Sequence, residues 1–395
     1  MFNPEFSIFN DWMFGKLTDL LSNINPPKDS ETILLTVGEP KLSPPLIVKE
    51  VFNKYHNDWR KYTPSNGTRY FRESVAEYIA NRYPKAADFL DVDDDINPVP
   101  GTRAPLFQIG LLLKGGNKEK NVSLVTNPFY HAWRAGAIAA NKKIVWMNTS
   151  HSTGWLPQVS KIEPKILQKA SIMYVCSPSN PQGVCASMDW LINTINICRK
   201  YDILLCVDEC YADIYRQDNM PPIGTIEALE KMGEGSKGVI LFHSLSKRSS
   251  AAGLRAGFIA GDSNIISMYR KLVANGGVVI SEPQLRVAQA LYQDEEHVKE
   301  NRLYYDKNFE ISEKILNIKK PQGGFFNFIP VNDDLVATKY LWENYGIKVM
   351  PGRYMAYSNG DNNPGKNYIR IALVNNAEIT DLALKKISKG LLEIQ

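Results

Sequence analysis

The chain has 395 residues, of which 46 are Lys or Arg and 42 are Asp or Glu, so its formal charge is +4 at pH 7. Its 44% hydrophobic and 22% charged residues are ordinary for a globular protein and exclude a disordered or fibrous chain. Basic and acidic residues are interleaved, which argues against a nucleic-acid partner. No apolar run reaches the roughly 18 residues that cross a membrane, and the N-terminus lacks the features of a signal peptide, so we expect a cytoplasmic enzyme.

The predicted elements divide the chain into three segments. Residues 1–45 contain several prolines and are expected to pack on a small C-terminal domain. Residues 46–282 alternate apolar runs with helical stretches, which predicts an α/β domain with a mainly parallel sheet between helices. The last strand follows its neighbour too closely for a helical crossover, so we expect it to be antiparallel. The expected strands are 121–126, 142–147, 171–176, 203–208, 239–244 and 256–261, and the expected helices include 130–140, 187–201 and 222–232.

Residues 283–395 no longer alternate short strands with helices, and their pattern predicts a smaller α+β domain. One long helical stretch covers 282–316. Short strands are expected around 325–329 and 367–374. No internal repeat or low-complexity segment is found in the chain.

Cysteine and histidine do not form a metal-binding pattern. All five cysteines lie between Cys176 and Cys210 without C-x-x-C spacing, and the five histidines are widely separated without an H-E-x-x-H motif. Zinc sites need such spacings, so no metal is expected. Cys176 and Cys206 end apolar runs, where a small buried thiol is the common explanation.

Two short motifs compete with a stronger pattern. Residues 233–238 satisfy G-x-G-x-x-G, but they follow an expected helix and precede an expected strand, so we interpret them as a turn. Ser244 and Lys247 satisfy S-x-x-K, the nucleophile motif of penicillin-recognising acyl enzymes. The partner motifs S-D-N and K-T-G are absent from the chain, so this hypothesis is a weak alternative.

A constellation of polar residues spread over most of the chain is more informative. It comprises Asn180 in SPSNPQG, Asp208 and Tyr211 in VDECYADIY, Lys247 and Arg255 in SLSKRSSAAGLRAG, and Arg370 in NYIRIALV. These residue types, in this order and at these intervals, resemble the fold-type I aminotransferases that use pyridoxal 5'-phosphate (PLP). The resemblance extends from Gly38 to Arg370. It implies the aspartate aminotransferase-like fold, in which a large domain with a mainly parallel seven-stranded sheet is joined to a smaller α+β domain.

The resemblance assigns the reactive groups of the cofactor to particular residues. Lys247 would form a Schiff base with the aldehyde and, once displaced by the amino donor, would move the proton; a lowered pKa suits both tasks. Asp208 ends an expected strand, at the sheet edge where α/β proteins bind ligands, and would keep the pyridine nitrogen protonated. Tyr211 and Asn180 would hydrogen-bond the phenolic oxygen. Tyr130, in NPFY, would stack on the ring.

The phosphate of the cofactor needs hydrogen-bond donors, and two segments offer them. One flanks the lysine, and the other opens an expected helix after NPVP. The expected phosphate contacts are Ser244, Ser246, Arg255, Gly101, Thr102 and Arg103.

Three further residues complete the implied site. Tyr62, in KYTPSNG, would reach the phosphate bound by a neighbouring subunit, which implies a homodimer with shared active sites. Arg370 would pair with the α-carboxylate of the substrate through two parallel hydrogen bonds. Gly38, in TVGEP, and Asn180 would add contacts to the same carboxylate.

Several segments also resemble the N-succinyldiaminopimelate aminotransferases of bacterial lysine biosynthesis, namely INPVPGTRAPLF, TNPFYHAW, VMPGRYMA, NNPGKNYIRIALV and the run around Lys247. These enzymes pass an amino group between glutamate and N-succinyl-2-amino-6-oxopimelate. One departure follows the PG-x-Y segment, which that subfamily usually continues with a small or apolar residue and then an arginine, whereas here Ala356-Tyr357 follows Met355. Arg353 or Lys348 could replace the missing arginine. Another is that Ser250-Ala251-Ala252-Gly253 replaces Asn-x-Pro-Gly.

A polyanionic substrate would need more guanidinium groups than one phosphate and one α-carboxylate require. We expect four arginines to gather near one pocket: Arg103, Arg248, Arg353 and Arg370. Arg248 and Arg353 could instead face solvent. An aspartate or aromatic aminotransferase and a C–S β-lyase remain alternatives, because both share the lysine, aspartate and arginine frame.

Overall fold

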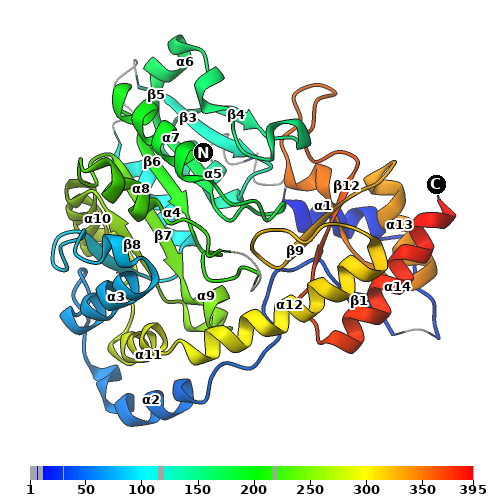
Figure 1. Cartoon of the computed structure of the whole chain (residues 1–395), viewed down its shortest axis with the longest axis horizontal. Helices are drawn as coiled ribbons and strands as arrows, with labels where there is room; N and C mark the ends of the chain where they lie inside the picture. The colour runs from blue at the N-terminus through cyan, green and yellow to red at the C-terminus, as the bar shows by residue number, and fades with distance from the viewer. Residues whose placement is uncertain (1–6, 8–11, 30, 114–119, 217–219, 395) are drawn as a thin grey trace.

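A seven-stranded sheet forms the centre of the larger lobe (Figure 1). The computed structural model describes residues 7, 12–29, 31–113, 120–216 and 220–394. Strands β7, β6, β5, β3 and β4 run parallel, whereas β8 is antiparallel to both neighbours, β7 and β2. The mainly parallel sheet and the antiparallel last strand are therefore confirmed. In spatial order the strands are β2 (Ile96–Val99), β8 (Gly257–Gly261), β7 (Val239–Ser244), β6 (Leu204–Asp208), β5 (Ala170–Cys176), β3 (Val122–Asn127) and β4 (Lys143–Asn148).

Strand β2 is the one member of this sheet that the apolar pattern does not predict. It has four residues and includes Asn97 and Pro98. Proline cannot donate a ladder hydrogen bond and is therefore confined largely to edge strands, and β2 lies at the edge beside β8. Nε of Arg270 donates to Oδ1 of Asn97 at 3.0 Å, which satisfies a polar side chain that is fully buried.

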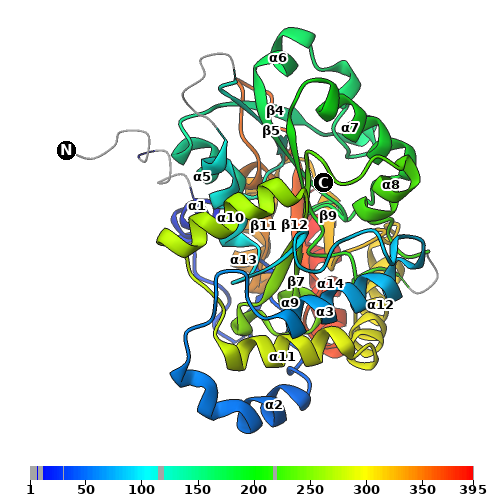
Figure 2. The same ribbon diagram turned by 90° about the vertical axis from the view of Figure 1, so that its left-hand side faces the viewer.

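Helices cover both faces of the sheet, as two perpendicular views show (Figure 1, Figure 2). Alternate residues of a strand point to opposite faces. In β5, Met173 and Val175 pack with α7 (Met188–Lys200) and α8 (Thr225–Met232). Ile172 and Tyr174 pack on the other face with three helices, α4 (Arg103–Gln108), α5 (His131–Ala139) and α10 (Ser263–Gly276). Burial on both faces explains why these strands read as continuous apolar runs.

The smaller lobe is built on two short sheets. Three strands form the first, in the order β11 (Met350–Pro351), β12 (Tyr368–Ala372) and β9 (Phe326–Pro330), all antiparallel. Two parallel strands form the second, β1 (Ile33–Leu34) and β10 (Ile347–Lys348). Two helices, α13 (Asp334–Tyr345) and α14 (Ala377–Glu393), pack on each other and enclose an apolar core.

The stretch 282–316 is two helices, so the prediction of one continuous helix is wrong. α11 (Glu282–Gln293) is followed by its C-cap residue Asp294, and α12 (Glu296–Leu316) begins two residues after Asp294. Asp294 has an extended backbone, and its Oδ1 accepts a hydrogen bond from the N–H of Glu296 at 2.9 Å. Aspartate favours this capping role over a helix interior. α11 packs on α2 (Ile47–Tyr55) and α3 (Arg69–Arg82), whereas α12 continues to α14 (Figure 1).

The N-terminal segment lies against the smaller lobe. Helix α1 (Met13–Leu21) buries Leu17 and Leu21 against Met350 and Met355, and β1 pairs with β10. α6 (Pro164–Lys169) and α9 (Leu245–Arg248) complete the helices of the larger lobe. Within the described residues, no helix combines the length and the apolar character that a membrane span requires. The domain boundaries at residues 45 and 282 stay predictions.

Candidate active site

The carboxyl ends of three adjacent parallel strands bring the candidate residues together. β5 ends at Cys176, β6 at Asp208 and β7 at Ser244, and Cys176 pairs with Asp208 in the ladder. Ligands of open α/β sheets bind at this edge, so the strand-end position expected for Asp208 is confirmed. The segments that follow these strands carry the next candidates, Asn180, Tyr211 and Lys247.

A cavity of about 590 Å³ lies above this edge, and residues of both lobes line it. Twelve of the fourteen residues expected at the site line the cavity: Gly38, Thr102, Arg103, Tyr130, Asn180, Asp208, Tyr211, Ser244, Ser246, Lys247, Arg255 and Arg370. Gly101 lies behind the wall, where a Cβ would stand 2.2 Å from Nη2 of Arg255. Tyr62 is fully exposed outside the cavity.

Lys247 lies in the short helix α9, directly after β7. Its Nζ donates a hydrogen bond to the carbonyl of Gly38 and stands 5.6 Å from the centre of the Phe325 ring. Burial is the main cause that lowers the pKa of Lys247, and the charges of Arg370 and Arg103 act in the same direction. The neutral amine is the nucleophilic form, so this environment favours nucleophilic chemistry at Nζ.

Asp208 is buried at the floor of the cavity. Its Oδ1 accepts a hydrogen bond from the backbone N–H of Cys210 at 3.2 Å. Burial raises the pKa of the Asp208 carboxyl to about 6, because desolvation penalises the ionised form. A cationic group placed against this carboxylate would offset that penalty. The position therefore suits a partner that carries a protonated ring nitrogen.

Arg370 enters the cavity from β12 of the smaller lobe and is only 3% exposed. Nη1 donates to Oδ1 of Asn180 at 3.2 Å, Nη2 donates to the carbonyl of Thr36, and the guanidinium lies 4.5 Å from the centre of the Phe326 ring. Its Nε has no hydrogen-bond partner among the described residues. Burial lowers the pKa of Arg370 to about 10, which leaves a buried cation that an anion would stabilise.

Two backbone positions with positive φ form a cradle beside these residues. Gly101 has φ +72°, and the close approach of the Arg255 guanidinium leaves no room for a side chain there. Arg255 itself has φ +54°, a strained conformation for a residue with a Cβ. Ser244 Oγ donates to Ser246 Oγ at 2.9 Å, and Thr102 lines the same cavity. Hydroxyl groups and a guanidinium in one cradle are suitable donors for a phosphate.

Tyr130 forms part of the wall near the start of α5. Its hydroxyl accepts a hydrogen bond from Nε of Arg103 at 3.0 Å, and its ring lies 4.4 Å from that of His131. Burial lowers the pKa of His131 to about 4, and the Arg103 charge acts in the same direction. His131 is therefore neutral at pH 7, so that Arg103 is the cation at this part of the wall.

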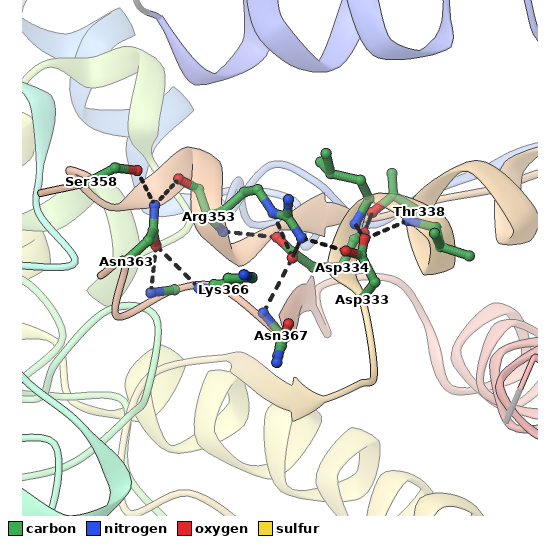
Figure 3. Close-up of polar contacts among 11 residues, drawn as sticks. Asp333, Asp334, Thr338, Arg353, Ser358, Asn363, Lys366 and Asn367 are labelled. Atoms are coloured by element: carbon green, nitrogen blue, oxygen red, sulfur yellow. Dashed lines mark hydrogen bonds and ion pairs between the residues drawn. The ribbon is translucent and has the colours of Figure 1, made fainter. Parts of the chain in front are cut away.

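The expected cluster of four arginines is only half present, because two are held elsewhere. Arg248 donates to Glu295 and lies 3.1 Å from Asp213, in a buried ion-pair network. Arg353 is paired with Asp333 and Asp334 on the smaller lobe (Figure 3). The side chains of Arg248 and Arg353 are thus oriented by carboxylates that are distant from them in the sequence. The suggested replacement by Arg353 or Lys348 is therefore wrong, since neither lines the cavity.

Several lining residues are missing from the sequence prediction. Arg134 and His131 follow Tyr130 on α5 and line the cavity. Their closeness to Tyr130 in the sequence was the one signal that could have placed them at the site. Cys176 and Cys210, among five free thiols, also face the cavity, so that Cys176 is not simply a core residue. An apolar part of the lining is contributed by α1 and the 3₁₀ turn 352–355, namely Trp12, Met13, Phe14, Tyr354 and Met355.

Comparison with known proteins agrees with this geometry. Residues 30–385 match the family described as aminotransferase class I and II. The chain belongs to this family. This chain is 30% identical to an aminotransferase from Neisseria meningitidis, with a TM-score of 0.92 and coverage of 96% of this chain and 97% of the other. The aminotransferase AspB from Helicobacter pylori is 28% identical to this chain, with a TM-score of 0.89 and coverage of 99% of both chains. An LL-diaminopimelate aminotransferase from Natranaerobius thermophilus is 26% identical, over 95% of this chain and 96% of its own length.

The aminotransferase family uses PLP, and the cavity fits this cofactor. The buried Asp208 carboxylate, the lysine with a lowered pKa and the hydroxyl and guanidinium cradle match its ring nitrogen, aldehyde and phosphate. The competing motifs lose their support. Residues 233–238 form a turn in which Gly233, Gly235 and Gly238 have positive φ, as predicted, and the serine acyl-enzyme hypothesis is wrong.

Proposed function

We propose that this enzyme moves an amino group between glutamate and N-succinyl-2-amino-6-oxopimelate in a ping-pong reaction. The arginines of the cavity carry the proposal, because four of them line it among the described residues, which is more than one phosphate and one α-carboxylate require. These four are Arg103, Arg134, Arg255 and Arg370, and the acidic residues of the lining are Glu39 and Asp208. A substrate with more than one carboxylate balances this excess.

When bound, PLP supplies an electron sink for the substrate's Cα carbanion. Lys247 would hold the cofactor through Nζ and, once the amino donor has replaced it, would move the Cα proton. Its buried position lowers the pKa of the amine, which favours the neutral form that this task needs. Asp208 would stabilise the protonated ring nitrogen, Tyr211 and Asn180 would hold the phenolic oxygen, and Tyr130 would stack on the ring.

The phosphate is assigned to the cradle of Arg255, Ser244 and Ser246 together with the backbone amides of residues 101–103, which leaves the Arg103 side chain for another contact. Arg370 binds the α-carboxylate through its guanidinium, whose Nε has no partner among the described residues. Gly38 and Asn180 complete this contact, and any Cβ at Gly38 would stand 2.3 Å from the Phe326 ring. A side chain at position 38 would therefore push into the substrate pocket or displace that ring.

One guanidinium group of the cavity wall, that of Arg103, is assigned to the distal carboxylate of the substrate. With Arg255 assigned to the phosphate and Arg370 to the α-carboxylate, the side chain of Arg103 meets the far end of the substrate. Nε of Arg103 is engaged by Tyr130, which orients the terminal nitrogens. Recognition of a carboxylate by a guanidinium adds directional hydrogen bonds as well as charge.

The cofactor assignment is tested by the visible absorption of the purified protein. We expect a band with PLP that disappears in Lys247→Ala and persists in Lys307→Ala, a matched change on the exposed side of α12. A protein that stays colourless with added PLP contradicts the assignment, as does a Lys247→Ala variant with the wild-type spectrum.

The substrate is tested by comparing kcat/KM for several amino donors with 2-oxoglutarate as the acceptor. We expect N-succinyl-LL-2,6-diaminopimelate to exceed aspartate and aromatic amino acids by at least tenfold. LL-diaminopimelate is the second candidate, because relatives of 24–26% identity carry that name. A higher kcat/KM for LL-diaminopimelate would select this second candidate. Release of pyruvate and a thiol from cystathionine would indicate a C–S lyase instead.

We also propose that the active unit is a homodimer in which each site borrows Tyr62 from its neighbour. The side chain of Tyr62 is fully exposed on this chain and does not line its own cavity. A tyrosine that reaches across a two-fold axis would be buried only in the assembled dimer.

A further inference from the structure

A short segment, residues 352–358, passes from the smaller lobe to the larger one beside the cavity, and we refer to it as the strap. It begins directly after β11 and includes the 3₁₀ turn Gly352–Met355. Because Met350 on β11 pairs with Arg370 on β12, the strap leaves the sheet close to the proposed α-carboxylate contact. The strap therefore has a defined starting point relative to the bound end of the substrate.

The far end of the strap is held by Asn127, the last residue of β3. Nδ2 of Asn127 donates to the carbonyl of Tyr357 at 3.0 Å, and the N–H of Tyr357 donates to Oδ1 of Asn127 at 2.9 Å. The Tyr357 ring stacks on Trp146, with centroids 4.7 Å apart and planes 14° apart. A third contact runs from the N–H of Phe129 to the carbonyl of Met355 at 3.1 Å. We call the paired Asn127 and Tyr357 the clasp.

Asn127 is suited to this role by its chemistry and its surroundings. An amide side chain presents both a donor and an acceptor and can therefore bond the N–H and the carbonyl of one backbone unit. Asn127 is fully buried, its Nδ2 also donates to Oδ1 of Asn148 at 2.8 Å, and its carbonyl accepts from the N–H of Thr149 at 2.9 Å. The amide therefore has one orientation, set by the larger lobe, and it imposes that orientation on Tyr357.

The near end of the strap is held by the ion pairs that Figure 3 shows. Nε of Arg353 donates to Oδ1 of Asp334 at 2.7 Å, its N–H donates to Oδ2 of the same carboxylate at 3.0 Å, and Nη2 donates to Asp333 at 2.8 Å. Asp334 is fully buried. Nδ2 of Asn363 donates to the carbonyl of Arg353 at 3.1 Å. The strap is thus fixed at both ends, to α13 and to β3.

Tyr354 and Met355 lie between the two anchors, and both line the cavity. They pack with Met13 and Phe14 at the start of α1, which also line it. The anchors therefore determine where this apolar wall stands relative to Arg370. A substrate held at Arg370 by its α-carboxylate extends its side chain away from the guanidinium, so a longer side chain has more opportunity to meet this wall, and wall position should affect long substrates more than short ones.

We propose that the clasp of Asn127 and Tyr357 is a positioning device that sets selectivity for the length of the substrate side chain. Neither residue lines the cavity, so both act through Tyr354 and Met355. The inference rests on the proposed function only in taking an acidic amino acid as the substrate. Loss of the clasp should leave the α-carboxylate contact intact and release the wall.

The test measures kcat/KM for straight-chain dicarboxylic amino acids of increasing length, from aspartate through glutamate and 2-aminoadipate to 2-aminopimelate. We expect Asn127→Ala and Tyr357→Ala each to lower the ratio of 2-aminopimelate to aspartate at least tenfold, with aspartate changed less than threefold. Asn127→Asp, which keeps the shape but loses the donor, should have an intermediate effect. Asn344→Ala, a matched change on the exposed side of α13, is the control.

An equal loss of kcat/KM for all four substrates in a folded variant, like an unchanged ratio, overturns the proposal. Because Asn127 is buried, Tyr357→Ala decides the question if the Asn127 variants do not fold. Inhibition constants of succinate, glutarate, adipate and pimelate give a second readout that does not require turnover, and the same length-dependent loss is expected. A wild-type enzyme that rejects N-succinyl-diaminopimelate contradicts the proposed substrate but still allows this length series to test the clasp.

Discussion

Arg370 and Asn180 join the two lobes across the cavity. Nη1 of Arg370, on β12 of the smaller lobe, donates to Oδ1 of Asn180, in the segment after β5 of the larger lobe, at 3.2 Å. The resemblance assigns one to the substrate and the other to the cofactor ring. Their direct contact means that a ligand bound by Arg370 also affects the residue proposed to hold the phenolic oxygen.

Replacement of Arg370 should mainly affect the reaction of the amino acid. We expect Arg370→Ala to lower kcat/KM for glutamate at least a hundredfold, about 3 kcal/mol, because a buried charged hydrogen-bond pair with the α-carboxylate is lost. PLP absorption should remain. Arg69→Ala, an exposed arginine on α3, is the matched control. An unchanged kcat/KM in Arg370→Ala would rule out the proposed contact.

Asp208 should destabilise the cofactor-free protein at neutral pH. Its pKa, raised to about 6 by burial, exceeds the ordinary 3.8, so the folded state prefers the protonated carboxyl. The ionised form therefore costs stability as the pH rises from about 4 to above 6, and a pKa difference of about two corresponds to about 3 kcal/mol.

We accordingly expect Asp208→Asn without PLP to gain up to about 3 kcal/mol in unfolding free energy at pH 8 and little at pH 4, while transamination nearly disappears. Urea unfolding at both pH values measures this gain. Asp94→Asn, on the exposed segment before β2, should show no such pH-dependent difference. Equal stability of Asp208→Asn and the wild type at pH 8 would contradict the prediction.

Arg353 should contribute to stability rather than to substrate charge. Arg353→Ala leaves the fully buried Asp334 carboxylate without its guanidinium partner, which typically costs about 3 kcal/mol. We expect a corresponding drop in the urea midpoint, whereas Arg69→Ala should have little effect. A drop in kcat/KM for acidic substrates with unchanged stability would instead restore Arg353 to the substrate site.

The shared active site can be tested by mixing two impaired variants. Lys247→Ala and Tyr62→Ala should each be poorly active alone. After subunit exchange, one site of each mixed dimer contains both wild-type residues, so activity should recover to about a quarter of the wild-type value. Mixing Lys247→Ala with Asp208→Asn is the control, because both changes lie on the same subunit's site. No recovery in the first mixture would argue against a shared site.

Much of the fold and of the candidate site could be predicted from local patterns. Strands buried on both faces read as apolar runs, and six of the seven in the large sheet were visible in this way. Strand β2 was not, because Pro98 is compatible with a strand only at a sheet edge, and edge position is a property of the assembled sheet. The interruption between α11 and α12 at Asp294 was missed for a similar reason. The Asp294 side chain accepts a hydrogen bond from the first turn of α12 because the chain turns there towards the smaller lobe, and that turn is a property of the folded chain.

The sequence by itself indicated the chemistry of the protein, because its lysine, aspartate, tyrosine and asparagine occur in the order and at the intervals of the fold-type I aminotransferases that they resemble. Only the tertiary structure decided which arginines belong to the cavity. Arg248 and Arg353 are drawn away by the carboxylates of Asp213 and Asp334, whereas Arg134 is brought in by α5. A long cationic side chain takes its direction from the nearest buried carboxylate, and that partner is distant in sequence and close only after folding.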